Sequence, residues 1–136
     1  MLRLDPVLFF DFMDELSRLP NLAGLDLSYA GLVNLDPFVN FPLLSRLILA
    51  GNMFENLNIL EMFTQLVELN IGGTHITDIS VLSSLQELED LDISYTTVTD
   101  INPLANLPKL RKLNIRNCPV KDISAIRYKL GLEIIR

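Results

Sequence analysis

One pattern of leucine and isoleucine occurs five times along the chain, at an interval of 22 residues. Each copy reads L-x-x-L-x-[L/I], and the copies begin at Leu22, Leu44, Leu66, Leu88 and Leu110. The alternation of apolar and polar positions within a copy predicts a short β-strand with one buried face. A single unit of this length cannot bury its own apolar side chains, so neighbouring units must stack. We therefore expect an α/β fold, a right-handed solenoid whose strands form one parallel, concave β-sheet.

The remainder of each unit is predicted to form the convex side, in short 3₁₀ or α turns. One column of this segment holds residues that favour helix N-caps: Asp36, Asn58, Ser80, Asn102 and Ser124. Two residues earlier lies a column that we interpret as turn formers rather than ligands: Asn34, Asn56, Asp78, Asp100 and Asp122. A third column should point inward, where Asn52 can bond the backbone: Ala30, Asn52, Thr74, Thr96 and Cys118.

Residues 1–21 precede the first unit and are predicted to form an N-terminal capping helix over residues 5–19. Asp5 can cap this helix, and Pro6 suits its first position. Apolar residues recur at spacings of three and four, as Leu8, Phe9, Phe12, Met13, Leu16 and Leu19. A repeat array must cover its apolar end, which favours a cap. The alternative is a degenerate first repeat, but Arg3 and Asp5 stand where its strand would need core residues.

Residues 22–136 are predicted to form five units and a partial sixth. Leu132 follows Leu110 by 22 residues, and Ile135 follows Leu113 by the same step. Ile135 should therefore take the buried position of Leu113 in a last strand. That strand either closes the domain or continues into a longer array.

These residues resemble the leucine-rich repeat family. The pattern L-x-x-L-x-L-x-x-[N/T/C]-x-[I/V]-x-x-[I/L] over residues 22–126 is similar to its 22-residue subclass, found in protein-phosphatase-1 regulators and bacterial internalins. Residues 77–82 (TDISVL) and 99–104 (TDINPL) are similar to the T-D-I-x-P-L turns of internalins. Ala30 departs from the pattern, which favours asparagine or threonine. The resemblance implies a protein-binding module, and no contact residue can be transferred from the family.

Charge and cysteine content restrict the partner and the compartment. The net charge of −6 argues against a nucleic-acid binder and against docking on anionic membranes. Cys118 is the single cysteine, which suits a reducing compartment. The sequence shows neither a secretory signal nor an apolar run long enough for a membrane span. We expect a cytoplasmic protein, with the nucleus as the alternative.

Binding is expected on the concave face, at positions that alternate with the core leucines. The candidate contact residues are Tyr29, Arg46, Ile48, Glu68, Asn70, Asp90, Asp92, Tyr95, Lys112, Asn114 and Arg116. Their charges alternate by row, which suits a strip that steers a complementary partner. The alternative is a solvated face whose charged rows satisfy one another.

Two tyrosines add an aromatic element to this face. Tyr29 and Tyr95 share a loop column with Gly51 and Gly73 between them, which predicts a shallow trough with ring walls. Aromatic residues of this kind are favoured as interface anchors. Ile48 is an apolar residue at an expected exposed position beside the trough. The alternative is that each tyrosine packs on its neighbouring loop.

Catalysis has little support in the sequence. His75 is the single histidine, and no cysteine or second histidine accompanies it at metal-ligand spacing. Asp90 and Asp92 alternate on one strand face and could hold a cation or act as an acid–base pair, although no third group accompanies them. We expect no catalytic residue, metal or cofactor. The alternatives to a protein-binding module are a scaffold or regulatory subunit of a larger assembly, with self-association through the C-terminal edge, and a carboxylate-based metal binder or enzyme.

Overall fold

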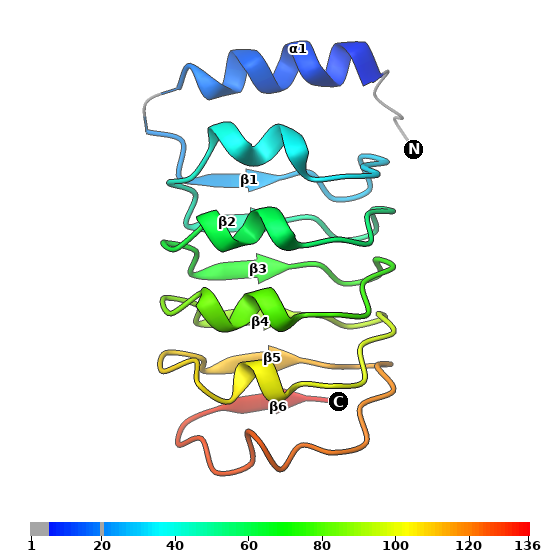
Figure 1. The fold of residues 1–136 in the computed structure, drawn as a ribbon, viewed down its shortest axis with the longest axis vertical. Helices are drawn as coiled ribbons and strands as arrows, with labels where there is room; N and C mark the ends of the chain where they lie inside the picture. The colour runs from blue at the N-terminus through cyan, green and yellow to red at the C-terminus, as the bar shows by residue number, and fades with distance from the viewer. Residues whose placement is uncertain (1–5, 20) are drawn as a thin grey trace.

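Six short strands lie side by side in one parallel sheet, in the order in which the chain forms them (Figure 1). The computed structural model describes residues 6–19 and 21–136. The strands are β1 (Gly24–Asp26), β2 (Arg46–Ile48), β3 (Glu68–Asn70), β4 (Asp90–Asp92), β5 (Lys112–Asn114) and β6 (Glu133–Ile135). Figure 1 shows a layer of short 3₁₀ helices in front of the sheet: η1 (Asp36–Asn40), η2 (Asn58–Met62), η3 (Ser80–Ser84) and η4 (Asn102–Leu104).

The first five strands pair at the interval that the sequence predicts. Leu25 pairs with Leu47, and the same step continues through Leu69, Leu91 and Leu113. Between the sheet and the 3₁₀ layer the apolar columns form one core, in which Phe38, Leu60, Leu82 and Leu104 are each fully buried. A fully buried side chain of this size contributes roughly 1.5–3 kcal/mol to stability. The predicted parallel sheet and stacked core are therefore confirmed.

The last strand breaks the interval. β6 pairs Ile134, not Ile135, with Leu113, so the final step is 21 residues. The segment before β6 forms turns without a 3₁₀ helix and ends at Gly131, whose φ of +77° is accessible to glycine. Ile134 packs against the core, and Ile135 pairs with Asn114 on the other face of the strand. The predicted burial of Ile135 in the position of Leu113 is wrong by one residue, which moves its side chain to the opposite face.

The inward polar column satisfies backbone groups inside the stack. The Asn52 side chain is 2% exposed; its amide nitrogen donates to the carbonyls of Leu27 and Leu49, at 2.9 and 2.8 Å. Its amide oxygen accepts the N–H of Leu32 at 2.9 Å. Thr74 and Thr96 are also buried, and each donates its hydroxyl to the carbonyl three residues earlier. Asn52 therefore ties the first repeat to the second, whereas Thr74 acts within its own repeat and Thr96 also contacts the Cys118 thiol of the next repeat at 3.4 Å.

Two polar columns lie on the convex side, and only the earlier one forms hydrogen bonds that order the turns. The prediction that the later column, which begins at Asp36, provides N-caps is wrong. Its first four members are instead the first residues of η1 to η4, and no side chain caps these helices. Ser124 lies in a turn. The residues of the column two positions earlier stabilise the turns, because a side-chain oxygen of each accepts the backbone N–H two residues ahead. The distances are 2.7–3.2 Å for Asn34, Asn56, Asp78, Asp100 and Asp122. These are Asx turns, as the turn interpretation predicted.

Helix α1 (Pro6–Ser17) lies beside the first repeat at one end of the array (Figure 1). Its first residue is Pro6, as predicted, while the proposed cap Asp5 lies outside the described residues. Met13 is buried and Leu16 is half-buried against the core, whereas Phe12 and Leu19 remain 42% and 52% exposed. Two of the predicted apolar positions, Phe12 and Leu19, are thus open to solvent. That α1 caps the array stays a prediction.

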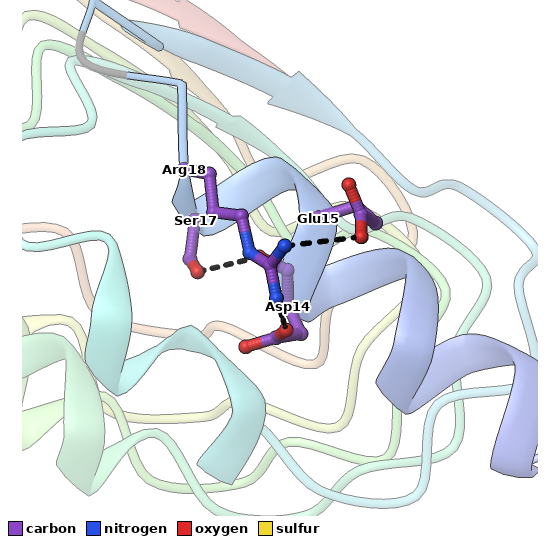
Figure 2. Close-up of polar contacts among 4 residues, drawn as sticks. All are labelled: Asp14, Glu15, Ser17 and Arg18. Carbon is purple, nitrogen blue, oxygen red and sulfur yellow. Dashed lines mark hydrogen bonds and ion pairs between the residues drawn. The ribbon is translucent and has the colours of Figure 1, made fainter.

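The solvent side of α1 is polar (Figure 2). Arg18 lies 2.7 Å from the carboxylate of Asp14 and 3.4 Å from that of Glu15, and the Ser17 hydroxyl donates to the backbone carbonyl of Asp14. All of these charged groups are exposed, so each ion pair contributes at most about 0.5 kcal/mol.

None of the helices in the described part of the chain is long and apolar enough to cross a membrane.

Replacing Asn52 with alanine should lower the unfolding free energy by roughly 3–5 kcal/mol, because the Leu32 N–H and the Leu49 carbonyl lose this partner inside the core and the Leu27 carbonyl keeps only the 3.3 Å bond from the Ala30 N–H. Thr74→Ala is the matched control in the same column and should cost only about 1 kcal/mol, since it removes one hydrogen bond. Urea unfolding of both variants measures the difference. Equal losses would contradict the special role of Asn52.

Acid should destabilise the fold partly through the Asx turns. The Ser80 backbone N–H holds the pKa of Asp78 below its ordinary value of 3.8, and Ser124 does the same for the pKa of Asp122. A carboxyl whose pKa is lower in the folded state adds stability above that ordinary value, and this stability is lost as the pH falls through the folded pKa. Asn34 and Asn56 make the same turn without a titrating group.

The double variant Asp78→Asn/Asp122→Asn should therefore keep its unfolding free energy near neutral pH and lose less of it in acid than the wild type. Urea unfolding at a series of pH values measures the slope. Asp11→Asn, which removes an exposed carboxylate on α1, serves as the control. An unchanged acid slope in the double variant would argue against this linkage.

Candidate protein-binding surface

The strand pairing places one charged column across the exposed face of the sheet. Each strand contributes its first residue, and neighbours in the column lie about 4.8 Å apart along the sheet. The column runs Gly24, Arg46, Glu68, Asp90, Lys112 and Glu133. The structure thus brings together the four charged residues predicted here and adds Glu133, which the one-residue shift of β6 moves into line.

Only part of this column is internally neutralised. Arg46 forms an ion pair with Glu68 at 2.9 Å, and both side chains are more than one-third exposed, so the pair adds at most about 1 kcal/mol. Asp90 lies 3.8 Å from the guanidinium of Arg111. Lys112 is exposed and forms no ion pair within 4 Å among the described residues. The alternative, a solvated face whose charges neutralise one another, therefore holds for Arg46 and Glu68. Lys112 remains available to a partner.

The second column of the sheet face serves the backbone. The side-chain oxygens of Asn70, Asp92 and Asn114 each accept the N–H two residues ahead, at 2.9, 2.8 and 3.1 Å. The second carboxylate oxygen of Asp92 accepts the amide of Asn114 at 2.9 Å. Asp26 makes the same turn, and the N–H and hydroxyl of Ser28 lower its pKa. Three of the predicted contact residues thus terminate strands.

Ile48 is the exception in this column. Its side chain cannot accept a hydrogen bond, and it is only 9% exposed although it lies outside the main core cluster. The expectation that Ile48 is an exposed apolar residue on this face is wrong, because the side chain is covered where it lies between Asp26 and Asn70. Ile48 therefore offers little surface to a partner.

A shallow hollow of about 310 Å³ occupies the same face over the later repeats. Its lining residues are Glu68, Leu69, Asn70, Asp90, Leu91, Asp92, Lys112, Asn114 and Ile135. Sequence reasoning missed Ile135, because it placed this side chain in the core. The hollow therefore combines charged groups of both signs with three apolar residues, Leu69, Leu91 and Ile135.

The loop column that contains the tyrosines has an unusual backbone. Its five residues all have positive φ: Tyr29 (57°), Gly51 (69°), Gly73 (67°), Tyr95 (56°) and Asn117 (56°). Glycine and asparagine tolerate this left-handed region, whereas it costs a tyrosine about 1–2 kcal/mol. Hydrogen bonds to the next repeat hold the conformation, as in the 2.8 Å bond from the Tyr95 N–H to the Arg116 carbonyl. The fold therefore enforces the backbone shape but does not require an aromatic side chain there.

The two tyrosines do not enclose an open trough. The Tyr29 ring lies over Gly51, since a Cβ built at Gly51 would stand 2.2 Å from a ring carbon. This is the packing described by the alternative reading of the sequence. A Cβ at Gly73 would meet only backbone atoms of Gly51, so the Tyr95 ring does not cover Gly73. Tyr29 and Tyr95 are nearly equally exposed, at 63% and 62%, so both rings remain open to a partner.

The remaining polar candidates make no cluster suited to chemistry. Arg116 is exposed, and its backbone N–H donates to the side-chain oxygen of Asn114. His75 is exposed in its loop, and the described residues hold no group of three or more histidine, cysteine or acidic side chains that could bind a metal ion. Cys118, expected to be buried, is only half-buried; its thiol donates to the carbonyl of Ile93 at 2.9 Å.

The repeat, the parallel sheet and the 3₁₀ layer together define a leucine-rich-repeat solenoid. A family model described as leucine-rich repeats in two copies matches residues 64–106 and, overlapping them, residues 86–128. This match covers residues 64–128 and confirms the leucine-rich-repeat resemblance that the sequence predicted. A comparison with curated proteins gives no match.

Solved structures with this fold include internalins of Listeria monocytogenes. Internalin C2 is 27% identical with a TM-score of 0.82; the match covers 88% of this chain and 53% of that one. The internalin InlF is 25% identical with a TM-score of 0.83, over 93% of this chain and 41% of that one. This chain thus spans about half the length of internalin C2 and less of InlF. TLR13, solved in complex with a single-stranded RNA, is 23% identical with a TM-score of 0.62 over 76% of this chain and 16% of that one, and shares the fold alone.

Replacing Tyr95 with glycine should leave the unfolding free energy unchanged or raise it by up to about 1 kcal/mol, because relief of the left-handed strain offsets the entropy cost of glycine. Tyr95→Val, which keeps a Cβ and adds a branch at the strained position, should lower it by about 1 kcal/mol. Urea unfolding compares the two variants. A clear loss of stability in Tyr95→Gly would show that the ring packs on the fold.

Proposed function

We propose that this chain is a non-enzymatic module that binds a partner protein through the exposed face of its sheet, around Tyr95. Leucine-rich-repeat proteins commonly mediate protein–protein interactions, and internalin-like repeat structures are typically binding modules. The observation that carries the proposal is the position of Tyr95. It is an exposed aromatic residue at a left-handed backbone position where three of the other four repeats hold glycine or asparagine. Strain of this kind, without a structural need for the side chain, is a feature of functional sites.

Charged groups of both signs occur in the repeat of Tyr95 and in the next one. Tyr95 is bonded through its backbone to the row of Arg116, and Lys112 and Asp90 lie at the hollow on the same face. An exposed aromatic ring supplies contact area at a small entropic cost, while rim charges select the partner and speed association. Asn70, Asp92 and Asn114 are occupied by the backbone and shape this surface rather than supply free hydrogen-bonding groups.

The other functions from the sequence have weaker support. A carboxylate-based metal or catalytic site would use Asp90 and Asp92, yet both oxygens of Asp92 already accept hydrogen bonds. A scaffold or regulatory subunit would instead associate through the C-terminal edge of the sheet, where β6 is the last strand. The single, half-buried Cys118 supports a reducing compartment, the cytoplasm or nucleus, as the site of this interaction.

Affinity capture from a lysate of the source cells tests the proposal, with identification of the captured proteins and titration of the main one. Tyr95→Gly and Asp90→Lys should each weaken its binding at least tenfold, about 1.4 kcal/mol. Matched controls outside the sheet face are Tyr128→Ala, an exposed aromatic near the C-terminus, and Asp11→Lys on α1. Both controls should bind as the wild type does.

Binding that survives both sheet-face variants would overturn the proposed surface. Loss of binding in the controls as well would show a contact elsewhere on the molecule. Unfolding curves of every variant separate a lost contact from a lost fold.

A further inference from the structure

A second hollow, larger than that on the sheet, lies where two loops lead into η1 and η2. Its volume is about 900 Å³, and it is lined by Val33, Asn34, Leu35, Asp36, Met53, Glu55, Asn56, Asn58, Ile59, Glu61 and Met62. We call it the repeat 1–2 groove. Its lining residues belong to η1, η2 and the loops that lead into them, and none of them lines the hollow on the sheet face. Its volume falls within the roughly 300–1,000 Å³ of ligand pockets, enough for a peptide segment.

Large apolar side chains of the groove are open to solvent. Val33 is 66% exposed, Met53 42% and Met62 47%. The core side of the same loops is already filled by other residues, since Leu32 and Phe54 are buried beneath them. The exposed side chains are therefore additional to the core. Methionine is flexible and polarisable, and is favoured at surfaces that accept apolar side chains of varied shape.

The other repeats show that the fold does not require these apolar residues. The column of Val33 holds polar residues in the other repeats, namely Glu55, Thr77, Thr99 and Lys121. The column of Met53 holds Gly31, His75, Thr97 and Pro119. The column of Met62 holds Asn40, Ser84, Asn106 and Tyr128. Most of these replacements are small or polar, so the apolar surface is specific to the first two repeats.

The groove is also strongly acidic. Asp36, Glu55 and Glu61 contribute to its lining, which contains no lysine, arginine or histidine. Arg46 is the only basic residue within residues 22–65, and it lies on the sheet face, paired with Glu68. An occupant must therefore supply both apolar side chains and positive charge. The acidic lining disfavours nucleic acid and anionic membranes by the same electrostatics.

We propose that the repeat 1–2 groove binds a basic amphipathic segment of a partner protein. The apolar face of the segment packs on Val33, Met53 and Met62, and its lysine or arginine side chains meet the carboxylates of Asp36, Glu55 and Glu61. This mode of recognition places an apolar stripe in a groove and uses the flanking charges for selection. The proposal extends the proposed function with a second contact surface and does not depend on Tyr95.

A labelled synthetic peptide of leucine and lysine tests the groove. Its leucines are placed at i, i+3, i+4 and i+7, and its binding is followed by fluorescence anisotropy. It should bind, and a leucine–glutamate peptide of the same pattern should bind at least tenfold more weakly. Because the whole chain carries a charge of −6, attraction alone is not evidence, and variants must locate the site.

Two double variants remove the two features of the groove. Met53→Thr/Met62→Ser installs residues that Thr97 and Ser84 hold in the same columns, so the fold should tolerate it. Glu55→Lys/Glu61→Lys reverses the charge. Each should weaken binding at least tenfold. Asp11→Lys/Glu133→Lys makes the same change in net charge away from the groove and should reduce binding less than threefold.

Methyl NMR locates the peptide directly, because the chain has four methionines and two of them line the groove. The methyl signals of Met53 and Met62 should shift on titration, while that of buried Met13 should not. Equal loss of binding in the control and the Glu55→Lys/Glu61→Lys variant, or unchanged binding in Met53→Thr/Met62→Ser, would overturn the proposal. Tyr95→Gly should leave peptide binding unchanged, so failure of one surface is distinguishable from failure of the other.

Discussion

Registered stacking of the repeats is the constraint on which the rest of the structure depends. Each unit leaves an apolar face and a row of backbone groups that only a neighbouring unit can cover. The ladder continues past the short strands, as the bonds from Tyr95 to Arg116 and from Gly51 to Gly72 show. Asn52 reinforces it by bonding carbonyls of two successive repeats. Because the ladder determines the backbone of the loops, surface positions can hold residues that the local conformation disfavours, including Tyr95 at positive φ.

The fold was predictable wherever only one strand register buries all the apolar residues. The pairing of β1 to β5 follows directly from the leucines, since a shift by one residue would expose them all. The last strand was not predictable in this way, because Ile134 and Ile135 are adjacent and either can fill the buried position. The convex polar columns posed a similar ambiguity. Asp78 and Ser80 are both suited to start a helix, and only the backbone geometry shows that Asp78 closes an Asx turn.

The sequence predicted which residues lie on the exposed face of the sheet. It did not predict which of their side chains are left without hydrogen bonds to the backbone. The pairing placed Glu68, Asp90 and Lys112 in one column, as expected from strand alternation. Sequence reasoning could not separate these residues from Asn70 and Asp92, because the same side chains serve as turn formers and as ligands. The cover over Ile48 and the ring of Tyr29 over Gly51 depend on packing between neighbouring repeats, which no periodic pattern reveals.

Internal repetition provides a measure of which residues the fold needs. At columns that carry the stack, such as that of Leu69, every repeat holds the same kind of residue. At the columns of Tyr95 and Met53, most other repeats hold glycine or polar residues, so backbone geometry and core packing are satisfied there without an exposed aromatic or thioether side chain. These departures expose apolar area to water, which does not favour folding of the isolated chain. The two proposed contacts would each cover such area with a partner, on two separate surfaces of the solenoid.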